Sequence, residues 1–310
     1  MARGLWHHPA DATKRPDAGP DADGGQAMAD GRWAEASDEA GSVTMQNDVT
    51  REPAILMQQE GGIHRLTLNR PQRLNALTRA MLSELSDRLA DIAADATARV
   101  LVITGAGRAF SAGQDLTDAG AIEDGRACRN TVERYYNPVI RQIHSLDLPV
   151  IAGVNGIAAG AGVSLALACD MVVAAESAAF DIAFARIGLI PDAGGTHQLQ
   201  RLLGPARAKA AAMLGEKIAA PAAEQLGLIY RAVPDQELAA TVDALAARLA
   251  NAPTKALALM KQAFHAGDHH SLEQQLALEA ELQSQAADTE DFAEGVAAFL
   301  AKRAPGFKGI

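Results

Sequence analysis

Hydrophobic residues from Ile55 onward follow the periods of regular secondary structure in turn. Residues 61–69 alternate between apolar and polar side chains, which predicts a strand. Thr78 is a candidate N-cap for a following helix. In that helix, apolar residues recur every three or four positions, at Met81, Leu82, Leu85, Leu89 and Ile92. The aliphatic run 99–104, ended by a glycine, then predicts a buried parallel strand.

The alternation of helix and strand continues to about residue 194. We expect helices over 128–145 and from about residue 160, and strands over 149–154, 171–175 and 179–182. Because such alternation requires crossover connections, it predicts an α/β fold. Further along, the pattern predicts helices almost throughout, over 195–203, 205–214, 221–226, 235–250, 252–266 and 270–287. Their Ala- and Leu-rich faces suit subunit packing and packing within the chain about equally.

The first 52 residues differ from the rest of the chain. They are rich in Ala, Asp and Gly and contain almost no branched aliphatic residues, which predicts a disordered acidic N-terminal extension. They lack the apolar segment of a secretory signal and the basic character of a mitochondrial presequence. We therefore expect three parts: this extension over 1–52, a folded core over 53–250, and a helical oligomerisation region over 251–310.

Composition narrows the function classes. A chain of 310 residues that is 48% hydrophobic can bury a large core, and its net charge of −10 argues against nucleic acid as a partner. The two cysteines, Cys128 and Cys169, form no disulfide or metal-ligand pattern, so we expect no metal and a cytoplasmic location. The uncharged stretch 149–169 is interrupted by four glycines and an asparagine and has no aromatic belt, so we do not expect it to enter a membrane.

Two corners rich in Gly and Ala each follow a hydrophobic strand. One is the segment 108–116, where amides near Gln114 are candidate hydrogen-bond donors; the other is Gly160-Ala161-Gly162, which begins a helix and leaves its first amides unpaired. Taken alone, the first corner is better explained as a tight connection with Asp115 as an N-cap, and the second as a turn. Together they predict two backbone donors that converge on one oxygen, as chemistry through an enolate or tetrahedral oxyanion requires.

Asp192 is a lone carboxylate between apolar residues and a helix start rich in small residues. This setting suits a partly desolvated acid with a raised pKa that moves a proton, and it equally suits an N-cap for the next helix. Ser111 and Ser164 lie in no nucleophile motif. Tyr135, Tyr136 and Phe184 are candidates to line a substrate pocket, although core packing explains each of them at least as well.

Four segments together resemble the crotonase, or enoyl-CoA hydratase/isomerase, superfamily. They are 68–77 (LNRPQRLNAL), 109–116 (AFSAGQDL), 154–162 (VNGIAAGAG) and 188–196 (GLIPDAGGT). The resemblance covers residues from about 53 to 310. It implies a crotonase-like spiral of ββα turns followed by a helical C-terminal trimerisation region, assembled as a homotrimer or as a hexamer of two trimers.

The same resemblance implies an acyl-CoA substrate and no separate cofactor, because CoA is part of the substrate. It assigns the amides of Gln114 and Ala161 to the thioester oxygen, and Asp192 to the third catalytic position. It places twelve further residues at the substrate: Arg73, Leu74, Ala76, Ala112, Gly113, Asp115, Leu116, Tyr136, Gly160, Ser164, Phe184 and Pro191.

Departures from the family pattern narrow the expected chemistry. Hydratases of this family use two glutamates, and Ser164 and Phe184 occupy their positions here, so standard hydration is not expected. Asp192, directly after Pro191, matches the acid of a subgroup that includes the 1,2-epoxyphenylacetyl-CoA isomerase of phenylacetate catabolism. We therefore expect an isomerase that moves a proton and a double bond in a 3-enoyl-CoA, or converts a ring epoxide to an oxepin.

Three alternatives stay open at this stage. One is a hydratase with an atypical active site. Another makes Asp192 a nucleophile, as in acyl-CoA dehalogenases, although their helper His and Trp are missing here. The last is a non-catalytic homologue that binds acyl-CoA or RNA; the acidic composition weakens the RNA version, and retention of Asp192 weakens the inactive one.

Overall fold

The structure, a computed structural model, describes residues 53–310, and the predicted N-terminal extension lies outside this range. The larger of two sheets has six strands, in the order β1 (Ile55–Glu60), β2 (Ile63–Leu68), β3 (Val100–Gly105), β5 (Val150–Val154), β7 (Met171–Ala175) and β10 (Arg231–Val233). Only the β1–β2 pair in this sheet is antiparallel. The parallel pairs are joined by crossovers, as the alternating sequence pattern predicts.

The smaller sheet has four strands, in the order β4 (Ala109–Ser111), β6 (Ile157–Ala159), β8 (Ala179–Asp181) and β9 (Lys217–Ala219). Each of β3, β5 and β7 in the larger sheet is followed along the chain by a strand of the smaller sheet and then by a helix. This repeat is the ββα spiral that the sequence predicts. It brings the ends of successive smaller-sheet strands to one region, where the two Gly/Ala corners lie.

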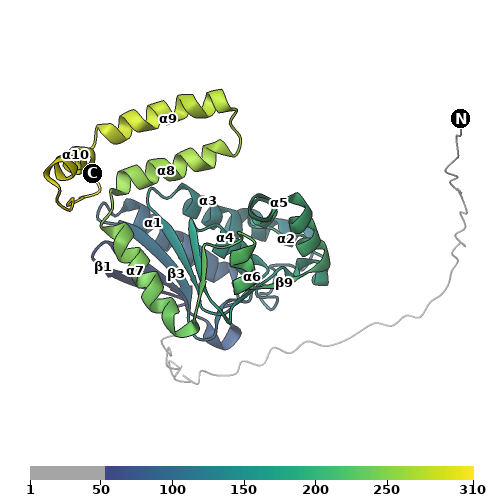
Figure 1. Cartoon of the computed structure of the whole chain (residues 1–310). Coiled ribbons are helices and arrows are strands. Elements are labelled where there is room, and N and C mark those ends of the chain that lie inside the picture. The colour runs from purple at the N-terminus through teal and green to yellow at the C-terminus, as the bar shows by residue number, and fades with distance from the viewer. Residues whose placement is uncertain (1–52) are drawn as a thin grey trace, which may run out of the picture. The chain divides into compact units, whose positions relative to one another are not determined.

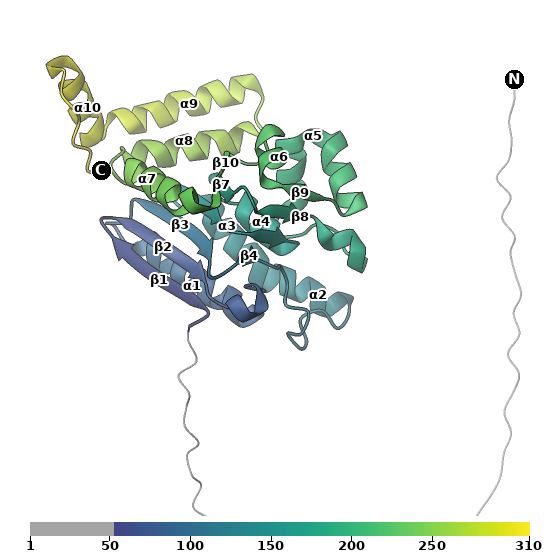
Figure 2. The ribbon, with the colours of Figure 1, turned by 60° about the horizontal axis from the view of Figure 1, so that its bottom comes forward.

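Helices cover and connect the sheets (Figures 1 and 2). The α-helices of the core are α1 (Arg79–Ala94), α2 (Gly125–Thr131), α3 (Asn137–Ser145), α4 (Ala161–Leu167), α5 (Gly195–Leu214), α6 (Ala220–Gln225) and α7 (Leu238–Ala250). The short elements are η1 (Pro71–Arg73), η2 (Val132–Tyr136), η3 (Ala183–Ile187) and η4 (Asp235–Glu237); η2 is a π-helix and the others are 3₁₀-helices. Every residue of α4 is buried, and this helix contacts strands of both sheets.

Most predicted elements are present, and the differences involve short strands and helix boundaries. The Thr78 hydroxyl caps α1 by accepting a hydrogen bond from Met81 N at 3.2 Å, and all five apolar positions predicted for that helix are buried. The region beyond Gly194 is not wholly helical, because β9 and β10 interrupt it; each is three residues long, too short to give a period. The helix predicted over 128–145 is divided by the π-helix η2.

The C-terminal region consists of α8 (Thr254–Gly267), α9 (Leu272–Ala287) and α10 (Glu290–Ala301), the last of which the sequence pattern did not predict. Helix α8 packs on the core, where Lys261 pairs with Asp170, and α9 and α10 lie beyond it (Figures 1 and 2). The three helices leave Phe264 and Phe299 more than three-quarters exposed beside a largely apolar groove of about 730 Å³. The oligomerisation role of this region stays a prediction, which the exposed apolar surface supports. Among residues 53–310, no helix is both long and apolar enough to cross a membrane.

Candidate active site

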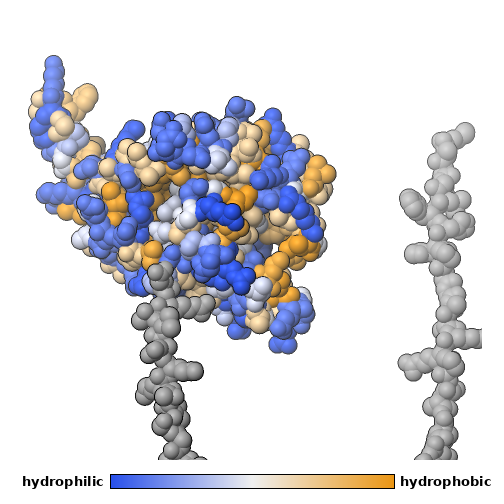
Figure 3. Space-filling model, turned by 90° about the horizontal axis from the view of Figure 1, so that it is seen from below, coloured by the Kyte–Doolittle hydropathy of each residue, from blue (hydrophilic) through white to orange (hydrophobic). Residues whose placement is uncertain are grey.

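A cavity of about 330 Å³ lies where the two Gly/Ala corners meet η2, η3 and the loop before α5. Eight of the predicted site residues line it: Ala112, Gln114, Leu116, Tyr136, Gly160, Ala161, Phe184 and Asp192. Leu116, Ile187 and Leu189 also line it and are exposed to solvent. Viewed from below, apolar surface gathers on the side of the molecule that carries η3 and α5 (Figure 3). An apolar chain with one polar end suits such a cavity.

The backbone around Gln114 is oriented by an isolated parallel bridge to Leu77. Leu77 N donates to Gly113 O at 2.7 Å, and Asp115 N donates to Leu77 O at 2.9 Å. Because these two groups face Leu77, the N–H of Gln114 between them faces the opposite way. Among the described residues it has no acceptor. It is therefore free to donate to a ligand.

The second free amide belongs to Ala161, the first residue of α4. Gly160 precedes it with φ 50° and ψ −124°, a conformation that favours glycine, and Gly160 N donates to Asp181 O at 2.9 Å. The first amides of a helix have no partner within the helix, and within residues 53–310 the Ala161 amide has none elsewhere. The partial positive charge at a helix start favours an oxyanion at this position.

Close backbone packing brings the two corners together. A Cβ added to Gly113 would lie 2.6 Å from Ala159 O and 3.2 Å from Ala161 N, and one added to Gly162 would lie 2.6 Å from Ser111 O. Real Cβ atoms do not approach backbone so closely, so glycine is required at both positions. Although Gly113 does not line the cavity, its lack of a side chain allows the corner that contains Gln114 to pack closely against the start of α4.

The buried side chain of Asn75, which sequence reasoning did not single out, supports the first corner. Its Nδ2 donates to Ala106 O at 2.9 Å and to Ala109 O at 2.8 Å, and its backbone oxygen accepts from Ser111 Oγ at 2.9 Å. Asn75 has φ 55°, a left-handed conformation that Asn tolerates better than most residues. The only signal in the sequence for Asn75 was its position in the motif 68–77, one of the four segments that carry the family resemblance.

Three of the predicted substrate contacts flank Asn75 and do not line the cavity. Arg73 is exposed at the end of η1. Leu74 has φ 51° and accepts a hydrogen bond from Ala112 N at 2.9 Å, and Ala76 O accepts from the Arg70 guanidinium. Leu74 and Ala76 therefore hold the corner in place, whereas the Arg73 side chain is available to a ligand that reaches beyond the cavity.

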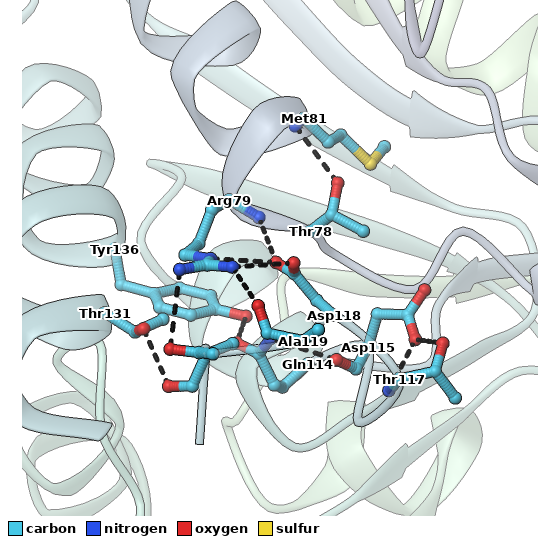
Figure 4. A network of polar contacts seen from close by, with 12 residues as sticks. Thr78, Arg79, Met81, Gln114, Asp115, Thr117, Asp118, Ala119, Thr131 and Tyr136 are labelled. Carbon is cyan, nitrogen blue, oxygen red and sulfur yellow. Dashed lines mark hydrogen bonds and ion pairs between the residues drawn. The ribbon is translucent and has the colours of Figure 1, made fainter. Parts of the chain in front are cut away.

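The carboxylates of Asp115 and Asp118 are fully engaged (Figure 4). Asp115 accepts from Arg70 Nη2 at 2.9 Å and from Thr117 N and Oγ1 at 3.0 and 2.6 Å. Burial alone would raise the pKa of Asp115, but these hydrogen bonds outweigh burial and lower it. Asp118 pairs with Arg79, which also binds Ala119 O. No helix follows Asp115, so the N-cap interpretation was wrong, and its role is structural.

Asp192 has the opposite environment. Its Oδ1 is buried and has no hydrogen-bond partner among the described residues, and burial raises the pKa of this carboxyl to about 6. Helix α5 begins at Gly195 with Gly194 as its N-cap and no side-chain cap, so Asp192 does not cap it, contrary to the second interpretation. The preceding Pro191 is buried outside the cavity, and the following Ala193 has φ 49°, a strained conformation that holds the loop in a sharp turn.

The two positions that carry glutamates in related hydratases are occupied as the sequence suggests. Ser164 is buried in α4 and donates from Oγ to the backbone oxygen of Asp192 at 2.8 Å, so it supports the Asp192 loop without reaching the cavity. Phe184 forms part of the cavity wall. Neither residue supplies a carboxylate. Within residues 53–310, no group of three or more His, Cys, Asp or Glu side chains is arranged to hold a metal ion.

The two adjacent tyrosines of η2 point to different surroundings. Tyr136 is 3% exposed, lines the cavity and donates from its hydroxyl to Gln114 Oε1 at 2.6 Å. Tyr135 packs against the hydrophobic core and does not line the cavity. The aromatic pocket predicted from the sequence therefore contains Tyr136 and Phe184.

Comparison with known proteins identifies the family of this chain. Residues 58–310 match the family described as Enoyl-CoA hydratase/isomerase. The chain is 48% identical over 257 residues to the 1,2-epoxyphenylacetyl-CoA isomerase of Escherichia coli K12, covering 82% of this chain and 98% of that protein. It is 50% identical over 248 residues to a probable enoyl-CoA hydratase of Rhodobacter capsulatus, covering 80% of this chain and 95% of the relative.

Solved structures show the same fold. An enoyl-CoA hydratase from Bacillus anthracis superimposes with a TM-score of 0.79 at 35% identity, over 83% of this chain and all of that one. The match extends through the spiral core, both corners and the C-terminal helices. The chain is therefore an enzyme of the enoyl-CoA hydratase/isomerase, or crotonase, family.

Proposed function

We propose that this enzyme is an acyl-CoA isomerase that moves a double bond from the β,γ to the α,β position of a CoA thioester. The observation that carries the proposal is the Asp192 carboxylate: its Oδ1 is buried and has no hydrogen-bond partner among the described residues, and it lies on the wall of the same cavity as the two free amides. Ser164 and Phe184 leave no second carboxylate to activate water. One acid that moves one proton is sufficient for isomerisation.

The proposed mechanism uses only this chain's own groups. The thioester oxygen accepts hydrogen bonds from the Gln114 and Ala161 amides. Asp192 removes a proton from C2, and the electron pair of that C–H bond forms a dienolate whose charge rests on the thioester oxygen. When the carbonyl reforms, the C2=C3 bond forms and the electrons of the C3=C4 bond take the same proton back at C4. Atoms and charge balance, so no metal or redox cofactor is needed.

The pKa of Asp192 suits both halves of this step. A carboxyl with a pKa of about 6 is mostly ionised at pH 7 and can accept the proton, yet it binds that proton more tightly than an ordinary carboxyl and holds it until transfer to C4. Each oxyanion amide typically contributes about 2.7 to 4 kcal/mol to the transition state. Proton transfer by Asp192 and oxyanion stabilisation together account for a substantial part of the rate acceleration expected of an enzyme.

The identity of the acyl group is a finer part of the proposal. The E. coli relative is named for an epoxide of phenylacetyl-CoA, and the cavity here contains Tyr136 and Phe184 as aromatic walls, which supports an aryl substrate beside 3-enoyl-CoA. The name of the R. capsulatus relative favours hydration as a second candidate activity. We propose a homotrimeric or hexameric assembly in the cytoplasm.

The test compares the wild-type enzyme with Asp192→Asn on 3-hexenoyl-CoA and crotonyl-CoA, with double-bond movement followed by absorbance and water addition by mass. We expect isomerisation without water addition in the wild type. In the variant the rate should fall by about 10²- to 10⁴-fold while thioester binding is retained. Asp91→Asn, on the exposed face of α1, is the matched control. Undiminished isomerisation by Asp192→Asn, or hydration as the main wild-type reaction, would contradict the proposal.

A further inference from the structure

Both polar atoms of the terminal amide of the Gln114 side chain are hydrogen-bonded at the edge of the cavity. Tyr136 donates from its hydroxyl to Gln114 Oε1 at 2.6 Å, and Gln114 Nε2 donates to Asp115 O at 3.2 Å (Figure 4). Asp115 is in turn fixed by Arg70 and Thr117. Gln114, whose backbone N–H faces the cavity, therefore has its side chain fixed by two hydrogen bonds to the cavity wall.

The π-helix η2 orients the Tyr136 side chain toward Gln114. Tyr136 is the last residue of the π-helix Val132–Tyr136, in which Asn137 N donates to Val132 O. A π turn contains one residue more than an α turn and rotates the following side chains by about 100°. Helix α2, which leads into this turn, is anchored by a hydrogen bond from Thr131 Oγ1 to Ala121 O at 2.7 Å. Tyr136 consequently lines the cavity and bonds Gln114, whereas Tyr135 does not line the cavity.

The Asp192 carboxylate lies on the wall of the same cavity as Tyr136. Burial, followed by the charges of Asp192, Asp118 and Asp115, raises the pKa of Tyr136 well above its usual value, so the phenol keeps its proton. That single proton can serve one acceptor at a time, and it serves Gln114. The Oδ1 of Asp192 is left unpaired.

Other charged groups around Tyr136 do not compete for its proton. Asp115 and Asp118 accept from Arg70 and Arg79, respectively. Arg186, at the cavity wall, is paired with Asp181. The remaining titratable group on the cavity wall is the Cys128 thiol.

We propose that Tyr136 is a positioning residue: its hydroxyl fixes the Gln114 side chain, and with it the amide that binds the thioester oxygen, and is thereby withheld from the Asp192 carboxylate. This inference deepens the proposed isomerase function and rests on it. The Tyr136–Gln114 hydrogen bond thus has two consequences: the Gln114 amide is positioned, and the hydroxyl does not bind Asp192. Separate substitutions of Tyr136 and Gln114 distinguish them.

The experiment uses Tyr136→Phe, Gln114→Leu and the double variant. Isotope-edited infrared spectra of bound [1-¹³C]hexanoyl-CoA, which has no double bond to move, report polarisation of the thioester carbonyl. The pH dependence of kcat on 3-hexenoyl-CoA reports the Asp192 ionisation. Tyr135→Phe is the matched control, because it removes the same atom from the adjacent residue outside the cavity.

We expect Tyr136→Phe to weaken carbonyl polarisation and lower kcat about tenfold, with KM changed less than about twofold, because the oxyanion amide loses its alignment. The acidic limb of the kcat–pH profile of this variant should stay near pH 6, since the Asp192 carboxylate still has no hydrogen bond from residue 136. Gln114→Leu should move that limb down by about one pH unit, because the released phenol then donates to the carboxylate and stabilises its charged form. In the double variant the limb should return to the wild-type position.

Wild-type spectra and kcat in Tyr136→Phe, or an unmoved acidic limb in Gln114→Leu, would overturn the inference. Tyr135→Phe should match the wild type in every measurement, and an equal loss there would also overturn it. If the wild type does not isomerise 3-enoyl-CoA, the proposed function fails, but the infrared comparison still decides whether Tyr136 positions Gln114. Failure of the wild type to bind hexanoyl-CoA would overturn both.

Discussion

Two regions beside the cavity each contain a carboxylate that the sequence assigned to the site, and their environments are opposite. At the corner before η2, Asp115 has three hydrogen-bond donors within 3.0 Å. At the wall before α5, the Oδ1 of Asp192 has none among the described residues. The pKa of the first is lowered and that of the second is raised to about 6. Hydrogen bonding, and not burial alone, separates a structural carboxylate from a reactive one.

The contrast also explains how an unpaired buried acid is tolerated. The corner around Asp115 is cross-linked by the Arg70–Asp115 and Arg79–Asp118 ion pairs, and it fixes the position of the Gln114 amide. The loop at Asp192 is held through its backbone, by Ser164 Oγ and Gly195 N on the Asp192 carbonyl oxygen. Because these bonds use the backbone, the Asp192 side chain does not hold the loop and is available to a substrate.

The largest effect on the free energy of unfolding is expected from breaking the Arg70–Asp115 ion pair. Asp115→Asn keeps the shape of the side chain but removes its charge, leaving Arg70 without a counter-ion in a site where Arg70 is only 15% exposed. We expect the free energy of unfolding to fall by about 3 kcal/mol at pH 7, measured by urea titration at fixed protein concentration. Because the folded-state pKa of Asp115 lies below 3.8, its contribution is fully present above that pH and is lost as the pH falls through the folded value.

Asp91→Asn, on the exposed face of α1, is the control for the Asp115 experiment, because its ion pair with Arg88 is open to solvent. It should change the free energy of unfolding by less than about 0.5 kcal/mol. A similar small change for Asp115→Asn would show that the corner does not depend on its carboxylate, and the comparison of the two regions would lose its basis.

A smaller effect, of the opposite sign, is expected at the unpaired carboxylate. Asp192→Asn should raise the free energy of unfolding by about 1 to 2 kcal/mol at pH 7.5, a value reduced to allow for partial solvent exposure, because ionisation of Asp192 in the folded state is unfavourable. The folded-state pKa of about 6 exceeds the unfolded value of 3.8, so the wild type loses stability as the pH rises between them. The advantage of the variant should therefore vanish below about pH 4, and a variant less stable than the wild type at pH 7.5 would contradict it.

Much of this difference could be predicted from the sequence. The strand and helix periods predicted an α/β fold, and the family resemblance implied the ββα spiral. Two Gly/Ala corners predicted a pair of converging backbone donors, because close backbone approach requires small residues, and the resemblance assigned these donors to Gln114 and Ala161. Asp192 was recognised as a candidate acid, with an N-cap as the alternative. The structure excludes the N-cap, since Gly194 takes the cap position.

What the sequence did not predict depends on contacts between distant segments. Asp115 and Asp192 are the same residue type, and the sequence does not show that Arg70, 45 residues away, donates to the Asp115 carboxylate. Nor does it show that Ser164, 28 residues from Asp192, bonds only the backbone oxygen of Asp192. Asn75 was missed because its bonds reach β4, more than thirty residues further on. The π turn that presents Tyr136 has no period of its own and looks like an uninterrupted helix.

The smallest effect is expected at Ser164, which connects α4 to the loop of Asp192. Ser164→Ala removes one hydrogen bond to the Asp192 carbonyl oxygen, where a Cβ on Gly195 would already come 2.7 Å from the hydroxyl. We expect a loss of about 1 kcal/mol in the free energy of unfolding and a two- to fivefold decrease in kcat with KM unchanged, because the carboxylate is displaced but still present. Ser86→Ala removes a comparable bond, to Gln142 at 2.8 Å between α1 and α3, and should reduce stability without changing kcat. Equal kcat values in the two variants would show that the Asp192 loop keeps its position without the Ser164 hydrogen bond.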